Sequence, residues 1–360
     1  MDMAFFPISS STINKISKGG SFDDVAGFLV LSRHADSKAL PGYAPHRFSG
    51  AGVNAVHEKI CIGEEGARGV LSRLKTGGFI GLAPPDVLTM SRYAKWDLKP
   101  EKPDLFLPHH FVDPGQGWSS PIQRLRKTTF SESTNDLQTL SAANRKLDCL
   151  MLLLTLHRKM TMSRFGGLDP AMACRPWTVQ TKDRGAGGTR WGATPDQEFF
   201  DSRFVHECLA HCPDLHTQSR NGFPRFLAAW RKLRRLGLLY EAVTLFPGNS
   251  HKVSGDLLYT VRTNDFFASA SASDGKGDPS LMASLEAAHG TLLAFYTQPS
   301  AGSDNEALRV VLPEDVGILV GVWRPRFRPD TPDVGRWFET ENREVRTALH
   351  RISSAQAQGS

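Results

Sequence analysis

The chain has 360 residues, of which 40% are hydrophobic and 22% charged, which suits two or three globular domains. The net charge of +6 favours a polyanionic partner, and five irregularly spaced cysteines argue against the disulfide framework of a secreted protein. No apolar run is long enough to span a membrane and the N-terminus lacks the basic start of a signal peptide, so we expect a cytoplasmic protein with no membrane partner.

The first part of the chain predicts a flexible start followed by three helices. Residues 1–20 are rich in Ser and Gly and are expected to be flexible. Ser21 is expected to cap the first helix and Ser49 the second, and the third helix begins at Gly63. The positions expected to face inward are apolar residues at helical spacing, namely Phe22, Val25, Ala26, Leu29, Val30, Val53, Val56, Ile60, Ala67, Val70, Leu71 and Leu74.

The third helix is the predicted DNA-contacting element of this first module, residues 21–97. Gly77-Gly78 ends the helix and a strand begins at Phe79, and three helices followed by a strand at these lengths are typical of a winged helix-turn-helix. The outward face of the helix is polar and mixed, which suits hydrogen bonds to base edges and phosphates. The predicted contact residues are Arg68, Ser72, Arg73 and Thr76. Dimerisation or protein docking, which winged helices also perform, is the alternative.

Residues 98–139 are rich in Pro, Gly and Ser and are interpreted as a long connector. Within this connector, residues 105–112 are too apolar for a free loop, so we expect them to be buried and to pack across the modules.

Residues 140–266 are interpreted as a second winged-helix module. We expect its first helix from Leu140 to Met160 and its second from Phe199 to Cys212. Residues 164–195 lie between them and contain many Gly and Arg residues, so they are expected to form a flexible insert.

The third helix of this second module carries the strongest signal in the chain. Its apolar stripe is formed by Phe223, Phe226, Leu227, Trp230 and Leu233, at helical spacing. Pro224 suits the first turn, Asn221 or Ser219 is the expected cap, and Gly237 is the expected C-terminal glycine.

The opposite side of this helix is mainly basic. Between Arg220 and Arg262 stand eight Lys or Arg residues against two acids, an excess that equals the +6 of the whole chain. Clustered charge of this kind favours contact with DNA, whereas a solvated surface helix is the plainer alternative. The predicted contact residues are Arg220, Arg225, Ala228, Arg231, Lys232 and Arg235.

Two β-strands are predicted to follow as a wing. Residues 241–246 and 257–262 are rich in β-branched and aromatic side chains, and the residues between them are typical of a turn. His251 and Lys252 would lie at the tip, near a phosphate backbone or a minor groove, with an ordinary hairpin loop as the alternative.

The C-terminal part is predicted to be a small α/β region, residues 281–352, after a flexible linker at 267–280. It contains a helix from 279 to 296, strands at 308–312 and 318–323 and a final helix from 337 to 352, as a third domain or as packing for the second module. The basic residues from Arg324 to Arg328 are more consistent with neutralisation by nearby acids than with phosphate binding. The predicted fold is therefore mainly α with small β wings, in two winged helix-turn-helix modules plus this α/β part.

The sequence offers no convincing signal for catalysis, a metal or a cofactor. Cys208, His211 and Cys212 lie close together, but a structural zinc site needs four ligands and no second pair of matching spacing is present. The glycine-rich stretch from Gly185 to Gly192 is not followed by the Gly-Lys-Ser/Thr of a phosphate-binding loop. We therefore expect a protein that is not an enzyme.

Two stretches carry a family likeness. Residues 68–80 and 229–240 both run from a basic helix through a leucine and a glycine into an apolar strand. This pattern resembles tandem winged-helix proteins of bacterial mobile elements, of which plasmid replication initiators are the best known. The resemblance covers about half of the chain and implies binding to repeated origin sequences and recruitment of host replication factors.

The leading hypothesis is a sequence-specific protein for double-stranded DNA, from a plasmid, phage or integrative element, that acts in replication initiation or its control. A transcriptional regulator that binds operator DNA and works with host transcription proteins is the alternative within DNA binding. A winged-helix adaptor that docks protein partners in a larger assembly is the alternative from another class.

Overall fold

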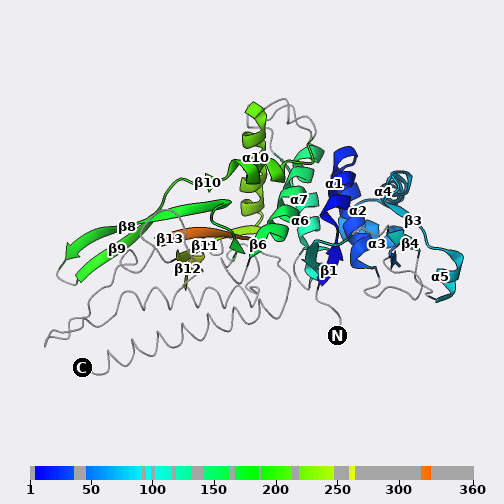
Figure 1. The fold of residues 1–360 in the computed structure, drawn as a ribbon, viewed down its shortest axis with the longest axis horizontal. Coiled ribbons are helices and arrows are strands. Elements are labelled where there is room, and N and C mark those ends of the chain that lie inside the picture. Colours follow the sequence, from blue (N-terminus) through cyan, green and yellow to red (C-terminus); the bar gives the residue numbers. More distant parts are fainter. Residues whose placement is uncertain are drawn as a thin grey trace, which may run out of the picture. The chain divides into compact units, whose positions relative to one another are not determined.

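The computed structural model describes residues 5–35, 46–90, 95–98, 102–115, 119–130, 142–161, 167–185, 188–212, 219–246, 259–263 and 318–325. The chain divides into two compact units (Figure 1). The first unit contains residues 1–158, 205–238 and 327–330, and the second contains 159–204, 239–326 and 331–360. The described residues form helices and small antiparallel sheets, which agrees with a mainly α protein with a smaller β component.

Residues 5–19, within the segment 1–20 that is predicted to be flexible, form a strand and a helix. Strand β1 (Phe5–Ile8) pairs antiparallel with β5 (Leu105–Pro108), which lies in the connector. Helix α1 (Ser10–Gly19) begins after Ser9, whose hydroxyl accepts a hydrogen bond from the backbone N–H of Thr12 at 3.3 Å. The Ser and Gly content suggested flexibility, but an N-cap, a buried apolar face and a distant strand partner stabilise regular structure in this segment.

Helix α2 (Phe22–Arg33) forms the centre of the first unit. Ser21 and Asp24 make a capping box, which confirms the predicted cap. The helix is buried on nearly all sides, because α1, α3 and α4 all pack against it. Gly27 permits a close approach of α4, since a Cβ atom at this position would clash with Val70 Cγ1 of α4.

Helices α3 (Val53–Ile60) and α4 (Glu64–Thr76) confirm the predicted second and third helices. Val56 and Ile60 of α3 are buried, and all four predicted inward residues of α4 are buried as well. Ser49 is not the cap of α3; it belongs to a strand, where its buried hydroxyl donates to the carbonyl of Leu31 at 2.7 Å.

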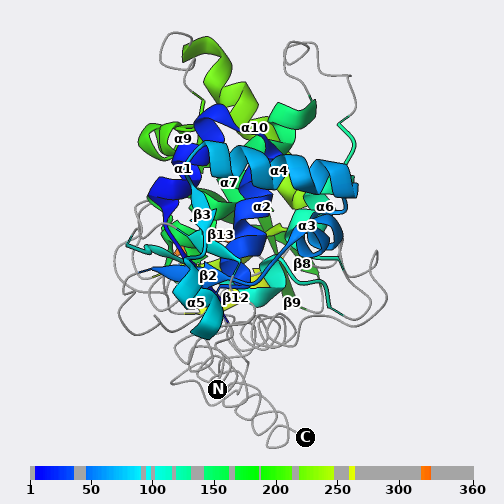
Figure 2. The same ribbon diagram turned by 90° about the vertical axis from the view of Figure 1, so that its right-hand side faces the viewer.

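A three-stranded antiparallel sheet completes this part of the chain. Strands β2 (Arg47–Ser49), β3 (Ile80–Leu82) and β4 (Trp96–Leu98) are arranged in the order β2-β4-β3, and the short helix α5 (Pro85–Met90) lies between β3 and β4. Gly78 allows the sharp exit from α4 with a φ of 72°. Figure 2 shows α4 running across α2, in contact with it.

The connector contains regular structure besides β5. A 3₁₀ helix, η1 (His109–Phe111), follows β5, and α6 (Pro121–Lys127) begins after Ser120, which accepts from the backbone N–H of Gln123 at 3.3 Å. Leu105, Leu107, Phe111 and Val112 are buried, as expected for the apolar stretch 105–112.

The remaining helices of the first unit are α7 (Ala142–Lys159), α9 (Ser202–Cys208) and α10 (Ser219–Arg235), although the first residues of α9 fall in the other unit. The predicted helix over Phe199 to Cys212 is shorter, because its first two residues form a strand, β10 (Phe199–Phe200). Pro224 lies inside α10 and not in its first turn. Gly237 ends this segment with a φ of 64°, as expected for a C-terminal glycine.

The predicted apolar stripe of α10 is buried only in part. Phe226, Trp230 and Leu233 are fully buried, whereas Phe223 is 47% exposed.

The second unit is built around an antiparallel sheet of order β10-β8-β13-β11-β12, with β9 paired to β8. Its strands are β8 (Ala173–Gly185), β9 (Gly188–Pro195), β10, β11 (Leu239–Phe246), β12 (Tyr259–Thr263) and β13 (Ile318–Pro325), besides the short pair β6 (Met160–Thr161) and β7 (Gly167–Leu168). The region predicted as a flexible insert, 164–195, thus supplies strands of this sheet. Its Gly and Arg content favoured a flexible interpretation, but pairing with β10 and β13 places β8 in the sheet.

Strand β13 is the part of the C-terminal region that the structure describes. It pairs with β11 over the whole length of both strands, from Leu239↔Pro325 to Phe246↔Ile318. The predicted strand at 318–323 therefore joins the sheet that contains the predicted wing strands. The linker 267–280, the helices at 279–296 and 337–352 and the strand at 308–312 lie outside the described residues. No described helix has the length and apolarity needed to cross a membrane.

Candidate nucleic-acid interface

The outer face of α4 is open to solvent. Arg68, Ser72, Arg73 and Thr76, the four predicted contact residues, are all exposed. Lys75 is exposed as well and lies two turns after Arg68, so that these two cations share one face with Ser72 between them. The arrangement offers two positive charges and a hydroxyl to a ligand that runs along the helix.

The two arginines of α4 are held differently. The Arg68 guanidinium lies 3.6 Å from Glu64 one turn before it, and its side chain is 68% exposed, so the pair is weak and solvated. The Arg73 Nε lies 2.8 Å from Asp24 Oδ1, and Asp24 is also the acid of the α2 capping box. Arg73 therefore fixes α4 against the start of α2 while more than half of its side chain stays exposed.

Two glycines lie on α4 where close packing with the rest of the protein does not require them. A Cβ atom at Gly66 would have ordinary contacts of 3.7 Å or more with Ile62, and one at Gly69 would meet only the end of the Arg73 side chain, at 3.2 Å. Glycine inside a helix costs about 1 kcal/mol relative to alanine. A helix that keeps two such residues on its surface has room for a close approach of another molecule to its backbone.

The basic face of α10 is narrower than the sequence predicts. Arg231 and Arg235 are exposed, as expected for contact residues, and Ala228 is half-buried. Lys232 is half-buried: its Nζ donates to the carbonyl of Thr129 at 2.9 Å and lies 5.0 Å from the centre of the Phe130 ring. Desolvation lowers the pKa of Lys232 below its ordinary value. This lysine binds the connector at Thr129 and Phe130, the last residues of it that the structure describes.

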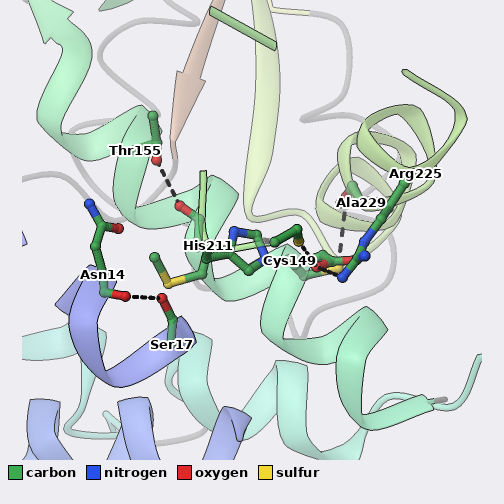
Figure 3. Close-up of polar contacts among 10 residues, drawn as sticks. Asn14, Ser17, Cys149, Thr155, His211, Arg225 and Ala229 are labelled. Carbon is green, nitrogen blue, oxygen red and sulfur yellow. Dashed lines mark hydrogen bonds and ion pairs between the residues drawn. The ribbon is translucent and has the colours of Figure 1, made fainter. Parts of the chain in front are cut away.

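The structure corrects the prediction that Arg225 contacts DNA, because its guanidinium lies inside the first unit. Its Nε and Nη2 atoms lie 2.6 and 2.7 Å from the two carboxylate oxygens of Asp148 on α7, and Asp148 is only 3% exposed. Figure 3 shows the Arg225 side chain extending from α10 towards Cys149, the next residue of α7. Asp148 is the single acidic residue of the α7 sequence, and its carboxylate is buried. A buried carboxylate is stabilised by a paired cation, which Arg225 of α10 supplies. Arg225 is therefore an anchor of α10.

His211 and Cys212 complete this buried cluster. The His211 Nε2 atom lies 2.8 Å from Asp148 Oδ1, and Cys212 Sγ lies 3.8 Å from the same oxygen. Burial by itself would raise the pKa of the Asp148 carboxyl, but hydrogen bonds from His211 and Arg225 bring it below its ordinary value. The side chain is thus an ionised carboxylate with several donors around it.

Among the described residues, Asp148, His211 and Cys212 are the group whose donor atoms lie close enough to hold a metal, within 4.8 Å of one another. Both oxygens of Asp148 already accept hydrogen bonds from Arg225. A cation at this point would face the guanidinium and would have three protein ligands, where a structural zinc site uses four. The geometry is that of a structural ion-pair network.

Other predicted contact residues lie outside what the structure describes. The side chain of Arg220 is not described, although its backbone belongs to α10. His251 and Lys252, at the predicted tip of the wing, lie outside the described residues. The strands on either side of this tip pair as expected, with Leu245 opposite Tyr259. Arg324, the first residue of the C-terminal basic cluster, is fully buried in the second unit. The acids expected to neutralise this cluster lie outside the described residues.

Sequence reasoning missed α6, whose polar side chains link elements of the first unit. A signal for this helix was present, because Ser120-Pro121 places a capping residue and a first-turn proline directly before an apolar and basic run. It was overlooked because the surrounding connector is rich in Pro, Gly and Ser. Asp148 was also missed, although an acid between Leu147 and Cys149 in an apolar helix indicates a buried partner.

Comparisons with known proteins add no information about this site. The family models contain no match to the chain. Neither the curated proteins nor the solved structures contain a match to it.

Proposed function

We propose that the chain is a sequence-specific protein for double-stranded DNA and that residues 21–97 form a winged helix-turn-helix module. The order of its elements supports this: a helix, a strand, two helices and two strands separated by the short helix α5, with the first strand paired to the last. In such a module the third helix, here α4, lies in the major groove, and the segment between the last two strands, which here contains α5, forms the wing.

The exposed face of α4 is the observation that carries the proposal. Arg68, Ser72 and Lys75 line one side of a helix that is anchored behind by its buried apolar stripe. Cationic side chains neutralise phosphates and donate to guanine, and a hydroxyl can serve either partner. Glu65, exposed near the start of α4, is suited to accept a hydrogen bond from cytosine. A face of this mixed kind favours base recognition over simple attraction to charge.

The glycines of α4 support the same proposal. Gly66 and Gly69 leave the backbone uncovered over the first two turns of the helix. A major groove admits a helix more deeply where side chains are missing. Glycine is unfavourable in a helix, and a close approach of the groove to the backbone at these positions would explain why two glycines are present.

A second contact is proposed for α10 through Arg231 and Arg235. Both are exposed, and the helix is held from behind by the Arg225–Asp148 pair, so that its outer face is presented in a fixed orientation. As to the process, we propose replication initiation, or its control, on a plasmid, phage or integrative element. This part rests on the likeness of residues 68–80 and 229–240 to the tandem winged-helix proteins of such elements.

Charge reversal on exposed residues tests the proposal. We would compare Arg68→Glu with Lys75→Glu on α4, Arg231→Glu with Arg235→Glu on α10, and Lys18→Glu with Lys102→Glu, a control pair outside both helices. All six side chains are exposed, and each pair changes the formal charge by the same amount. The full chain would be titrated with a random genomic duplex pool at several salt concentrations, and the bound fraction would be sequenced.

We expect one short motif to be enriched by the wild type, with affinity falling steeply as salt rises. The α4 pair and the α10 pair should each weaken binding by about tenfold or more, because several phosphate contacts are replaced by repulsion, whereas the control pair should change it far less. Equal losses of affinity in all three variants would show that binding depends on net charge alone. Weak binding without a motif would sink the proposal and favour a winged-helix adaptor that docks protein partners.

A further inference from the structure

Asp24 is a buried acid in the first turn of α2 that serves two partners at once. Its Oδ2 atom accepts hydrogen bonds from the backbone N–H of Ser21 at 2.8 Å and from the Ser21 hydroxyl at 2.9 Å. Its Oδ1 atom accepts from Nε of Arg73 on α4 at 2.8 Å. The capping box fixes the carboxylate, and the Asp24 side chain is only 5% exposed. Asp24 therefore offers Arg73 an acceptor whose position is set by the start of α2.

The contact with Asp24 uses one nitrogen of Arg73 and leaves the outer end of its side chain available. Among the described residues, Asp24 is the hydrogen-bond partner of Arg73, through Nε, and the terminal nitrogens Nη1 and Nη2 have none. The Arg73 side chain is 57% exposed although it is bound to a buried acid. An arginine that reads guanine donates to O6 and N7 through two nitrogens at once. Arg73 presents the pair of donors that this contact needs.

The guanidinium of Arg73 reaches the middle of the polar face of α4. Side chains in a helix lean towards its N-terminus, and a Cβ atom at Gly69, one turn before Arg73, would lie 3.2 Å from Arg73 Nη1. Gly69 belongs to a stripe at helical spacing, opposite the buried residues, that also contains Glu65, Ser72 and Thr76. The missing side chain at Gly69 gives the guanidinium room on this stripe.

The other cations of α4 are held less firmly than Arg73. Arg68 lies 3.6 Å from Glu64 in a solvated pair, and Lys75 is exposed. Figure 2 shows α4 crossing α2, the helix that carries Asp24. A mobile cation suits a phosphate, whereas a guanidinium that is already oriented loses less conformational freedom when it binds a base edge. Arg73 is thus the residue of α4 best prepared to distinguish one base from another.

We infer that Asp24 is a positioning residue, which orients the Arg73 guanidinium so that it donates to one guanine of the DNA target, with Gly69 providing the space. The inference rests on the proposed function and assigns one base of the target to one arginine. Because Asp24 is buried, it acts on the DNA only through Arg73. Its removal should therefore change the base preference at one position and leave the phosphate contacts of α4 in place.

The test starts from the motif that the wild type selects from the random duplex pool. Each G·C pair of this motif is changed to A·T, one at a time, and the affinity of the full chain for every duplex is measured at several salt concentrations. The wild type should lose about tenfold or more in affinity at the guanine that Arg73 contacts. Arg73→Ala should abolish this penalty at one position and keep the penalties at the others, which identifies the position.

Asp24→Asn is the decisive variant, because an amide has a single acceptor oxygen and cannot serve both the cap and Arg73. We expect the penalty at the Arg73 position to fall to about threefold or less. The other penalties and the salt dependence should stay nearly the same, since the phosphate contacts are kept. The double variant Asp24→Asn with Arg73→Ala should discriminate bases no differently from Arg73→Ala alone, because Asp24 acts through Arg73.

Ser21→Ala is the matched control. It removes the hydroxyl of the same capping box but leaves the backbone N–H of residue 21 on Asp24 Oδ2, so the full penalty should remain. If Asp24→Asn does not fold, as judged by circular dichroism, Gly69→Ala takes its place. Alanine favours the helix, but its methyl group crowds Arg73 Nη1, so this variant should be stable and should lower the same penalty.

A folded Asp24→Asn protein that keeps the full penalty would overturn the inference, and so would Gly69→Ala where it is the deciding variant. Loss of the penalty in Ser21→Ala, or wild-type penalties at every position in Arg73→Ala, would overturn it as well. In all of these outcomes the wild type still selects a motif. Failure of the wild type to enrich any motif is distinguishable from them, because it would remove the proposed function itself.

Discussion

Helices α4 and α10 look similar in sequence, but the structure uses their basic residues differently. On α4 all four predicted contact residues are exposed. On α10, Arg225 is bound to the buried Asp148 and Lys232 binds the connector, so that Arg231 and Arg235 remain as exposed contact candidates. Helical spacing therefore gives only the largest number of basic residues that a helix face can expose. An acid elsewhere in the chain can bind one of these cations inside the core.

The largest expected effect separates Arg225 from the exposed arginines of the same helix. Arg225→Ala should lower the free energy of unfolding by about 3–5 kcal/mol, because it leaves the buried Asp148 carboxylate without its bidentate partner. Arg231→Ala should change it by no more than about 0.5 kcal/mol, as is usual at exposed positions. Urea unfolding of both variants measures the difference. Equal stabilities would place Arg225 on the surface, as the sequence predicts.

Acid should destabilise the first unit through His157 on α7. Burial lowers the pKa of His157 to about 3 from its ordinary value of 6.5, and neither ring nitrogen has a hydrogen-bond partner among the described residues. Since the unfolded chain binds the proton more readily, stability is fully present above pH 6.5 and is lost as the pH falls from 6.5 towards 3, by at most about 1.4 kcal/mol per unit.

The measurement is urea unfolding across this pH range for the wild type and His157→Leu. The variant should lose this component of the slope and keep the one from Asp148, whose lowered carboxyl pKa makes its stability contribution disappear only at lower pH. A slope that is the same in both proteins between pH 6.5 and 4 would contradict the assignment.

A smaller effect distinguishes Lys232 from Arg235. Lys232→Ala should cost about 1 kcal/mol of stability, because a hydrogen bond and a cation–π contact are lost. Arg235→Ala should leave stability nearly unchanged and weaken DNA binding more than Lys232→Ala does, since its side chain is exposed. Thermal unfolding and DNA titration of both variants give the two readouts. The opposite ranking would make Lys232 the contact residue of α10.

The smallest expected effect on stability comes from Gly66→Ala on α4. Because a Cβ atom has room at this position, the substitution should raise the free energy of unfolding by about 0.5–1 kcal/mol through helix propensity. The same methyl group should weaken DNA binding if the groove approaches the backbone there. A variant that is more stable and binds DNA as well as the wild type would show that Gly66 does not face the groove.

Local features of the sequence determined much of the first unit. The buried residues of α4, the Ser21 cap of α2 and the glycine after α10 follow from helical spacing and from the backbone preferences of single residues, which act within a few positions along the chain. The candidate residues on α4 follow from the same spacing, because whatever is not in the apolar stripe of a surface helix faces outward. The sequence alone therefore sufficed for the exposure of these residues, although it did not indicate that Arg73 pairs with Asp24.

Only the tertiary structure decided which distant residues meet. The pairing of β1 with β5 ordered a segment that looked flexible, and the pairing of β13 with β11 brought the C-terminal region into the sheet of the predicted wing. The Arg225–Asp148 pair, which joins residues separated by 77 positions, removed one predicted contact from α10. Composition and spacing carry no information about such partners, because the free energy that selects them comes from burial and pairing between elements that are far apart in the chain.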